Sequence, residues 1–226
     1  MSIETATQVC SVAVHNEDEL VAAQSLHIER SHSEKLADML DNIIQSANKS
    51  IADLDAVAVS EGPGSYTGLR IGASLAKGIC YAANKPLISI DTLKAMASSV
   101  NQYNNRGALL CPMIDARRSE VYCAVFDSHL NNIKATKPMV LESNSFQELL
   151  EENEMWFFGD GSHKAKDILT ENGNSNFIEN VEPTAKVIGE LANQKFAKSE
   201  FVDLAYFEPF YLKDFHVTKP RKEKQI

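Results

Sequence analysis

The sequence predicts an α/β protein of two lobes, and three observations lead to this fold class. Strand-like and helix-like apolar spacings alternate along about the first hundred residues. A polar, turn-rich segment at 101–107 then interrupts the pattern. After this segment the alternation starts again with strand-like stretches, as at the beginning of the chain. We therefore predict lobes at 1–104 and 105–226, which share a topology although no residue-level repeat is visible.

The first half contains the elements of a compact α/β unit. Apolar and β-branched runs predict strands within 3–14 and at 20–26, 56–60 and 87–90, with a polar turn at 15–19. Helical spacing of apolar residues predicts helices at 33–48 and 69–84, and Asp91 or Thr92 caps a third. The glycine-rich segment 61–68 joins the 56–60 strand to the second helix.

The second half repeats this pattern of strands and helices. Apolar runs predict strands at 108–115 and 120–126, joined by 116–119, with further strands near 139–142 and at 155–158. Helices are expected at 145–152, 162–170 and 184–197, and a turn at 159–161. Both halves therefore begin with meander strands and continue as alternating helices and strands.

Composition excludes several classes of protein. Of the 226 residues, 44% are hydrophobic and 23% charged, which is ordinary for a globular chain and argues against disorder. The net charge of −9 argues against non-specific DNA binding, which needs a basic surface. No apolar run approaches the ~18 residues of a membrane span, and the N-terminus lacks the features of a signal peptide. The four cysteines lie in apolar runs without a Cys-x-x-Cys pair, so we expect buried thiols in the cytoplasm rather than zinc ligands.

Several motifs resemble the bacterial TsaB (YeaZ) family. They are Ile3-Glu4-Thr5-Ala6-Thr7, His32-Ser33-Glu34, the run from Gly62 to Gly72, the run from Ile114 to Tyr122, Phe158-Gly159-Asp160-Gly161 and Pro209-Phe210-Tyr211-Leu212. The resemblance extends over nearly the whole chain, and the glycine-rich run with its continuation is its most specific part.

The resemblance implies a two-lobed fold of the actin, Hsp70 and sugar-kinase type, which is ribonuclease H-like. It also implies a non-catalytic role: TsaB-like proteins bind and activate the catalytic subunit TsaD and work with the ATPase TsaE. Together these proteins place a threonylcarbamoyl group on an adenosine beside the tRNA anticodon. The resemblance further implies a homodimer when the chain is alone, tRNA contact only through the complex, no membrane, and ATP and metal on the partner subunits rather than on this chain.

One departure from the family concerns the first strand. Members usually have several apolar residues before the Ile-Glu-Thr segment, whereas here only Met1 and Ser2 precede it. Either the first strand is short or the recorded start is displaced.

The glycine-rich segment has two interpretations. Backbone N–H groups between a strand and a helix favour anions, so Gly62, Gly64, Ser65, Thr67 and Gly68 can form an anion-binding loop. However, the spacing matches neither the dinucleotide-binding nor the P-loop pattern. We therefore favour a tight turn that needs glycine, with Thr67 as a candidate N-cap of the following helix.

No catalytic or metal site is predicted for this chain. Glu4 stands at the end of the first strand, where kinases of the implied fold keep an acidic residue, but Gly159-Asp160-Gly161 reads more simply as a strand-ending turn than as a second phosphate loop. A small ATPase or kinase of the same fold nevertheless remains the alternative function. His27 and His32 lack the spacing of metal ligands on one helix face, and Ser65 does not fit a nucleophile elbow, which argues against a protease or hydrolase.

The two helices of the first half predict a protein interface. The second helix is apolar on two sides, so one side packs on the sheet and the other needs a neighbouring helix or a partner. Small residues also permit close helix approach. The predicted interface residues are Leu36, Met39, Leu40 and Ile43 on the first helix and Leu69, Gly72, Ala73, Leu75, Ala76 and Ile79 on the second. The sequence leaves open whether the row of Leu69, Ala73, Ala76 and Cys80 or the row of Ile71, Leu75, Ile79 and Ala82 faces the partner.

The C-terminal residues 219–224 form a small basic tail, with four cations around Glu223. Such runs are usually solvated. The tail can contact tRNA phosphates, but four cations on a chain of charge −9 do not support strong binding alone.

Overall fold

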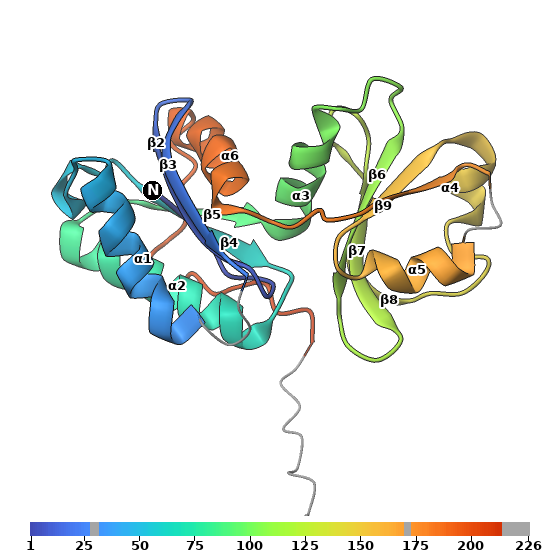
Figure 1. Ribbon diagram of the computed structural model, residues 1–226, viewed down its shortest axis with the longest axis horizontal. Helices are drawn as coiled ribbons and strands as arrows, with labels where there is room; N and C mark the ends of the chain where they lie inside the picture. The colour runs from blue at the N-terminus through green and yellow to red at the C-terminus, as the bar shows by residue number, and fades with distance from the viewer. Residues whose placement is uncertain (28–31, 170–172, 214–226) are drawn as a thin grey trace, which may run out of the picture.

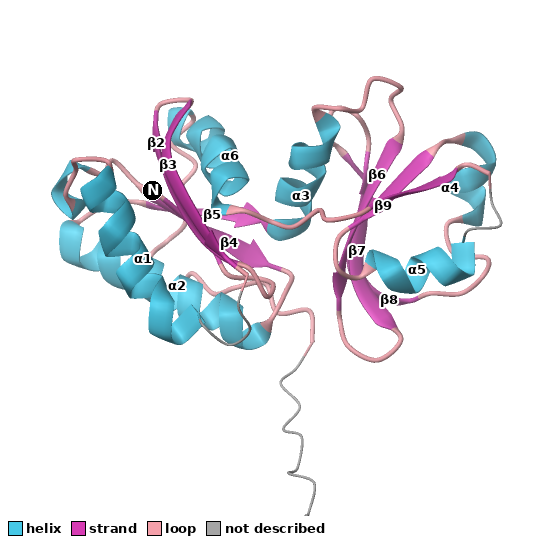
Figure 2. Cartoon of the chain, viewed as in Figure 1, coloured by secondary structure: helices cyan, strands magenta, loops and turns pink. Residues whose placement is uncertain are grey.

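Two mixed five-stranded sheets organise the chain into two lobes (Figures 1 and 2). The structure is a computed structural model that describes residues 1–27, 32–169 and 173–213. The basic tail, like the segment between His27 and His32, therefore lies outside the described residues.

The first sheet has the order β3-β2-β1-β4-β5. Its strands are β1 (Ser2–Glu4), β2 (Cys10–Asn16), β3 (Glu19–Leu26), β4 (Val57–Gly62) and β5 (Leu87–Asp91). The first three strands are antiparallel neighbours, while β4 runs parallel to β1 and β5 parallel to β4. The first strand is short, with three residues. The helices α1 (His32–Ser46) and α2 (Tyr66–Ala83) cover one face of this sheet, and the 3-10 turn η1 (Ile51–Asp53) precedes β4.

The second sheet has the order β10-β9-β6-β7-β8. Its strands are β6 (Leu109–Asp115), β7 (Glu120–Phe126), β8 (Asn132–Val140), β9 (Met155–Phe158) and β10 (Ser175–Ile178). The helix α3 (Thr92–Asn101) packs on one face with Phe126 and Phe158. The helices α4 (Gln147–Glu152) and α5 (Ser162–Leu169) contribute to a second core around Phe157.

The two sheets share one topology, as the sequence predicts. In each, counting strands along the chain, the spatial order is third, second, first, fourth, fifth. In each, the first strand is antiparallel to the second and parallel to the fourth. The duplicated two-lobed α/β architecture is thereby confirmed.

Two edge strands differ from the prediction. β8 starts at Asn132, well before the expected 139–142, and β10 was not expected at all. Both lie at the edges of the second sheet. Edge strands carry charged residues and proline because one side has no ladder partner, and β8 accordingly contains Lys134, Lys137 and Pro138. This composition masks the strand pattern on which the sequence reading depends.

The last helix, α6 (Ala185–Ala197), lies on the first lobe. Its residues Val187, Ile188 and Leu191 pack with Ala58, Ile88 and Ile90 of the first sheet. The predicted division into 1–104 and 105–226 therefore misplaces this helix and residues 202–207, because they pack on the first lobe although they follow the second lobe in the chain. All four cysteines are buried free thiols, as expected. Within the described residues no helix is long and apolar enough to cross a membrane.

Candidate partner-binding face and strand-end carboxylates

A groove lies between α1 and α2 on the outer side of the first lobe. Its volume is about 710 Å³. The two helices run side by side over the sheet (Figure 1). The groove is lined by His32, Ser33, Leu36 and Ala37 from α1 and by Tyr66, Thr67, Arg70, Ile71, Ser74 and Leu75 from α2. We call this surface the α1–α2 groove.

Most of the predicted interface residues lie in the protein's own core instead. Leu36 and Ala76 are 1% and 0% exposed, and the same core holds Met39, Leu40 and Ile43. Leu69, Gly72 and Ala73 are buried as well. Each fully buried aliphatic side chain contributes about 1.5–3 kcal/mol to folding. These residues hold the helices on the sheet, and of them only Leu36 also lines the α1–α2 groove.

The structure separates the two apolar rows of α2. Leu69, Ala73, Ala76 and Cys80 form the core row, because all are buried. Ile71, Leu75 and Ile79 are half-buried, packing against the core with one side and leaving the other accessible. Thr67, Ser74 and Gly78 are exposed beside them. The outward face of α2 is therefore a mixture of small and aliphatic side chains.

Close backbone contact explains the glycine-rich segment. A Cβ on Gly68 would overlap the carbonyl oxygen of Thr5, and one on Gly72 would overlap the Thr5 hydroxyl. The Thr5 hydroxyl in turn donates to the carbonyl oxygen of Gly68 (2.8 Å). The start of α2 thus lies directly against the turn after β1, which agrees with the steric interpretation of this segment.

The N-cap of α2 is Ser65, not Thr67, whose side chain is exposed. The Ser65 side chain accepts from the N–H of Gly68 (3.3 Å), and the Ser65 N–H donates to the carbonyl oxygen of Ala6 (2.6 Å). Two N–H groups of the predicted anion-binding loop are therefore engaged within the chain. Gly62 ends β4 and Gly64 lies in the bend that follows, and anion binding there stays a prediction.

Glu4 is fully buried at the carboxyl end of β1. Its Oε1 accepts from the N–H of Ala6 (2.5 Å) and from the hydroxyl of Ser60 (3.0 Å), while Oε2 has no hydrogen-bond partner among the described residues. Burial raises the pKa of Glu4 to about 7, although its hydrogen bonds lower it. Asp91, the N-cap of α3, also has its pKa raised by burial, to about 6.

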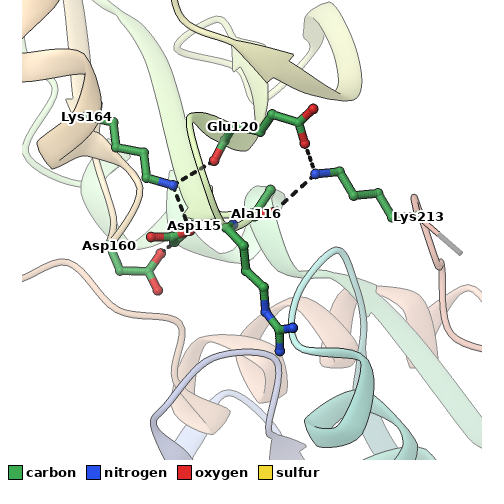
Figure 3. A network of polar contacts seen from close by, with 7 residues as sticks. Asp115, Ala116, Glu120, Asp160, Lys164 and Lys213 are labelled. Atoms are coloured by element: carbon green, nitrogen blue, oxygen red, sulfur yellow. Dashed lines mark hydrogen bonds and ion pairs between the residues drawn. The ribbon is translucent and has the colours of Figure 1, made fainter. Parts of the chain in front are cut away.

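The second lobe closes the equivalent strand end with a charged network (Figure 3). Oδ1 of Asp160 accepts from the N–H of Asp115 (2.9 Å), and Oδ1 of Asp115 accepts from Nζ of Lys164 (2.8 Å). Lys164 also donates to the carbonyl oxygen of Glu120 (2.9 Å). Burial and the nearby Asp115 raise the pKa of Asp160, against the effect of its hydrogen bonds. The 159–161 segment is a strand-ending turn, as predicted, between β9 and α5.

The two histidines considered as metal ligands have other contacts. Nε2 of His32 lies 3.3 Å from the carbonyl oxygen of Val9, and His32 is buried at the start of α1. His27 pairs with Glu182 at 3.1 Å. In the described ranges no group of histidine, cysteine and carboxylate side chains could hold a metal ion.

The chain is similar in sequence to known proteins of one family. Residues 23–220 match the family model described as TsaD: tRNA N6-adenosine threonylcarbamoyltransferase. The chain is 31% identical over 224 residues to the tRNA threonylcarbamoyladenosine biosynthesis protein TsaB of Escherichia coli, which covers 95% of this chain and 94% of that protein.

Two solved structures share the fold. One, from Pseudomonas aeruginosa, is described as an uncharacterized protein with similarity to peptidase YeaZ; it has a TM-score of 0.83 at 22% identity over 94% of this chain and 98% of its own. The other, YeaZ from the same organism, has a TM-score of 0.79 at 21% identity over 93% and 98%. Together with the sequence relatives, these observations show that the chain belongs to the TsaB (YeaZ) family of tRNA threonylcarbamoyladenosine biosynthesis proteins.

Proposed function

We propose that this chain is a non-catalytic subunit that binds and activates a TsaD-type catalytic subunit, with a TsaE-type ATPase, in the cytoplasm. The complex transfers a threonylcarbamoyl group to an adenosine beside the tRNA anticodon, and tRNA meets this chain only within the complex. ATP and metal belong to the partner subunits.

The observation that carries this proposal is the outward face of α1 and α2. A groove of about 710 Å³ runs between two helices that are already anchored by a complete core of their own. The half-buried Ile71, Leu75 and Ile79 need no partner for folding, yet they offer apolar area that association would remove from water. Thr67, Ser74 and Gly78 let another helix come close. When the catalytic subunit is absent, a second copy presents the same surface, which favours a homodimer about a twofold axis.

The alternative, a small ATPase or kinase of the same fold, finds less support. Its second phosphate loop would be the 159–161 turn, but the N–H of Gly161 already donates to the carbonyl oxygen of Met113 (3.1 Å). The Asp160 carboxylate is likewise engaged with the N–H of Asp115. We expect negligible ATP turnover by the isolated chain. A turnover that disappears in Glu4→Ala would favour the alternative.

The partner face is tested by Leu75→Glu. The charge would remain wet in the free chain but would lose its water on docking, so we expect a folded monomer whose affinity for the TsaD-type subunit falls by two orders of magnitude or more, about 3 kcal/mol. The matched control is Ile133→Glu, which makes the same kind of change at a 47% exposed side chain on β8. Analytical ultracentrifugation and titration calorimetry measure both. Unchanged binding by a folded Leu75→Glu variant would remove α2 from the interface.

A further inference from the structure

Residues 201–213, which we call the strap, bind along the first lobe before reaching the second. Val202 forms a bridge with Leu87, so the strap partly covers the edge strand β5. Val202, Leu204 and Phe207 pack against the first core. Lys77 of α2 donates to the carbonyl oxygens of Ala205 (3.2 Å) and Phe207 (3.0 Å). The first part of the strap is therefore fixed to α2 and β5.

The strap then passes the start of α2, where it contacts a residue of the α1–α2 groove. The N–H of Phe210 donates to the carbonyl oxygen of Glu61 (2.6 Å). The ring of Tyr211 lies 4.8 Å from the ring of Tyr66, at 42°. Arg70 completes this contact, because its guanidinium lies 5.5 Å from the centre of the Tyr66 ring and donates to the Tyr66 hydroxyl (3.2 Å). Tyr66 and Arg70 both line the groove.

The next two residues of the strap belong to the second lobe. Leu212 packs against the core that contains Phe126 and Phe158. Nζ of Lys213 donates to the carbonyl oxygen of Ala116 (3.1 Å) and pairs with the carboxylate of Glu120 (Figure 3). It also lies 5.6 Å from the centre of the Tyr122 ring. Lys213 thus makes three contacts, all with residues of the hairpin formed by β6 and β7.

The two attachments are so close along the chain that little slack separates them. Two residues of extended backbone span at most about 7 Å, so Tyr211 cannot shift far without moving Lys213. A continuous chain of contacts therefore leads from Tyr66 through Tyr211 and Lys213 to the second sheet.

We propose that the strap is a mechanical link through which Tyr66, on the α1–α2 groove, sets the position of the second lobe relative to the first. If the proposed function is right, a partner seated in the groove displaces or fixes Tyr66 and so changes the angle between the lobes. The link itself is a property of the isolated chain.

Interlobe distances measured by electron spin resonance test the link without any partner. Spin labels are placed on Asn42→Cys in α1 and Lys137→Cys in β8, two exposed positions on different lobes. The four native cysteines are buried, so a chain without the two introduced cysteines serves as the labelling blank. The variants are Tyr66→Ala, Tyr211→Ala, Lys213→Ala and the double variant Tyr66→Ala with Lys213→Ala. Circular dichroism establishes that each is folded, and Tyr66→Leu replaces Tyr66→Ala if the latter is not.

We expect each single variant to broaden or shift the distance distribution, and the double variant to add nothing to the single ones, because the contacts act in series. Tyr206→Ala is the control within the strap, since its side chain is 86% exposed, and it should match the parent. A parent-like distribution for Tyr66→Ala or Tyr66→Leu, or additive effects in the double variant, would overturn the proposal. Because no partner is present, this result is independent of the Leu75→Glu binding test.

Discussion

The turns after β4 and after β9 occupy equivalent places in the two lobes, and they solve the same packing problem with different electrostatics. Each joins the fourth strand of its sheet to a helix, and at each a glycine lies in close contact with the first strand or the residue that follows it. In the first lobe Gly68, in the first turn of α2, lies against the carbonyl oxygen of Thr5, and in the second Gly159, directly after β9, lies against that of Met113. The backbone device is therefore common to both lobes.

The carboxylates at these turns differ. Glu4 is fully buried, and one of its carboxylate oxygens has no hydrogen-bond partner in the described part of the chain. Its pKa is raised by burial and lowered only by hydrogen bonds, not by a neighbouring cation. Asp115 and Asp160, in contrast, belong to a network with Lys164 at the surface. The two lobes thus share the close contact between a glycine and the backbone of the first strand or the residue after it, but the charged groups around this contact differ between them.

The largest expected effect tests the shared backbone device. Gly68→Ala and Gly159→Ala each place a Cβ on a carbonyl oxygen, and Gly159 also has φ of +97°, which disfavours alanine. We expect each change to lower the free energy of unfolding by about 3 kcal/mol, measured by urea denaturation. The control is Gly78→Ala on the open side of α2, where a Cβ meets nothing within 4 Å, and which should gain about 0.5–1 kcal/mol. If Gly159→Ala is tolerated while Gly68→Ala is not, the equivalence of the two turns is wrong.

The next effect tests the buried carboxylate of the first lobe. The pKa of Glu4 is raised from 4.5 to about 7 by burial, so the folded chain binds a proton that the unfolded chain has released. Stability should therefore fall as the pH rises from about 4.5 to 7 and should be flat, for this group, above that range. The shift corresponds to about 3 kcal/mol.

Glu4→Gln isolates this contribution, because glutamine does not titrate. Urea denaturation of both proteins at several pH values gives the difference between the two curves, in which Asp91 and Asp160 cancel. We expect the stability of the parent relative to Glu4→Gln to decrease by up to about 3 kcal/mol across this window. A constant difference would show that Glu4 is ionised throughout.

The smallest effect tests the charged network of the second lobe. Lys164→Met keeps the aliphatic stem but removes the ion pair with Asp115. The side chain of Lys164 is 24% exposed and that of Asp115 is 45% exposed. Exposed pairs of this kind contribute about 0.2–1 kcal/mol, and salt weakens them. We expect a loss in this range at low salt that shrinks at high salt, by the same denaturation measurement. A loss independent of salt would point to the hydrogen bond with the Glu120 carbonyl oxygen instead.

The sequence predicted the two-lobed fold well because buried strands such as β4 and β9 are short apolar runs between clear turn signals. It could not assign the two rows of α2, since a helix that is apolar on two sides has no periodicity that distinguishes the sheet from a neighbouring helix. A usable signal was present: Gly68, Gly72 and Ala76 are spaced four residues apart, which puts three small residues on one face for close backbone contact. Ser65 as the N-cap was missed because Thr67 fits the same preference, and only the geometry of the turn decides between them.

The position of α6 has a consequence for how the protein is made. The face of the first sheet formed by Ala58, Ile88 and Ile90 is covered by residues 187–192, which leave the ribosome after the whole second lobe has been synthesised. During synthesis the first lobe therefore displays an uncovered apolar sheet until the chain is nearly finished, the condition under which nascent chains aggregate or recruit chaperones. The lobe that begins the sequence is the last to be completed.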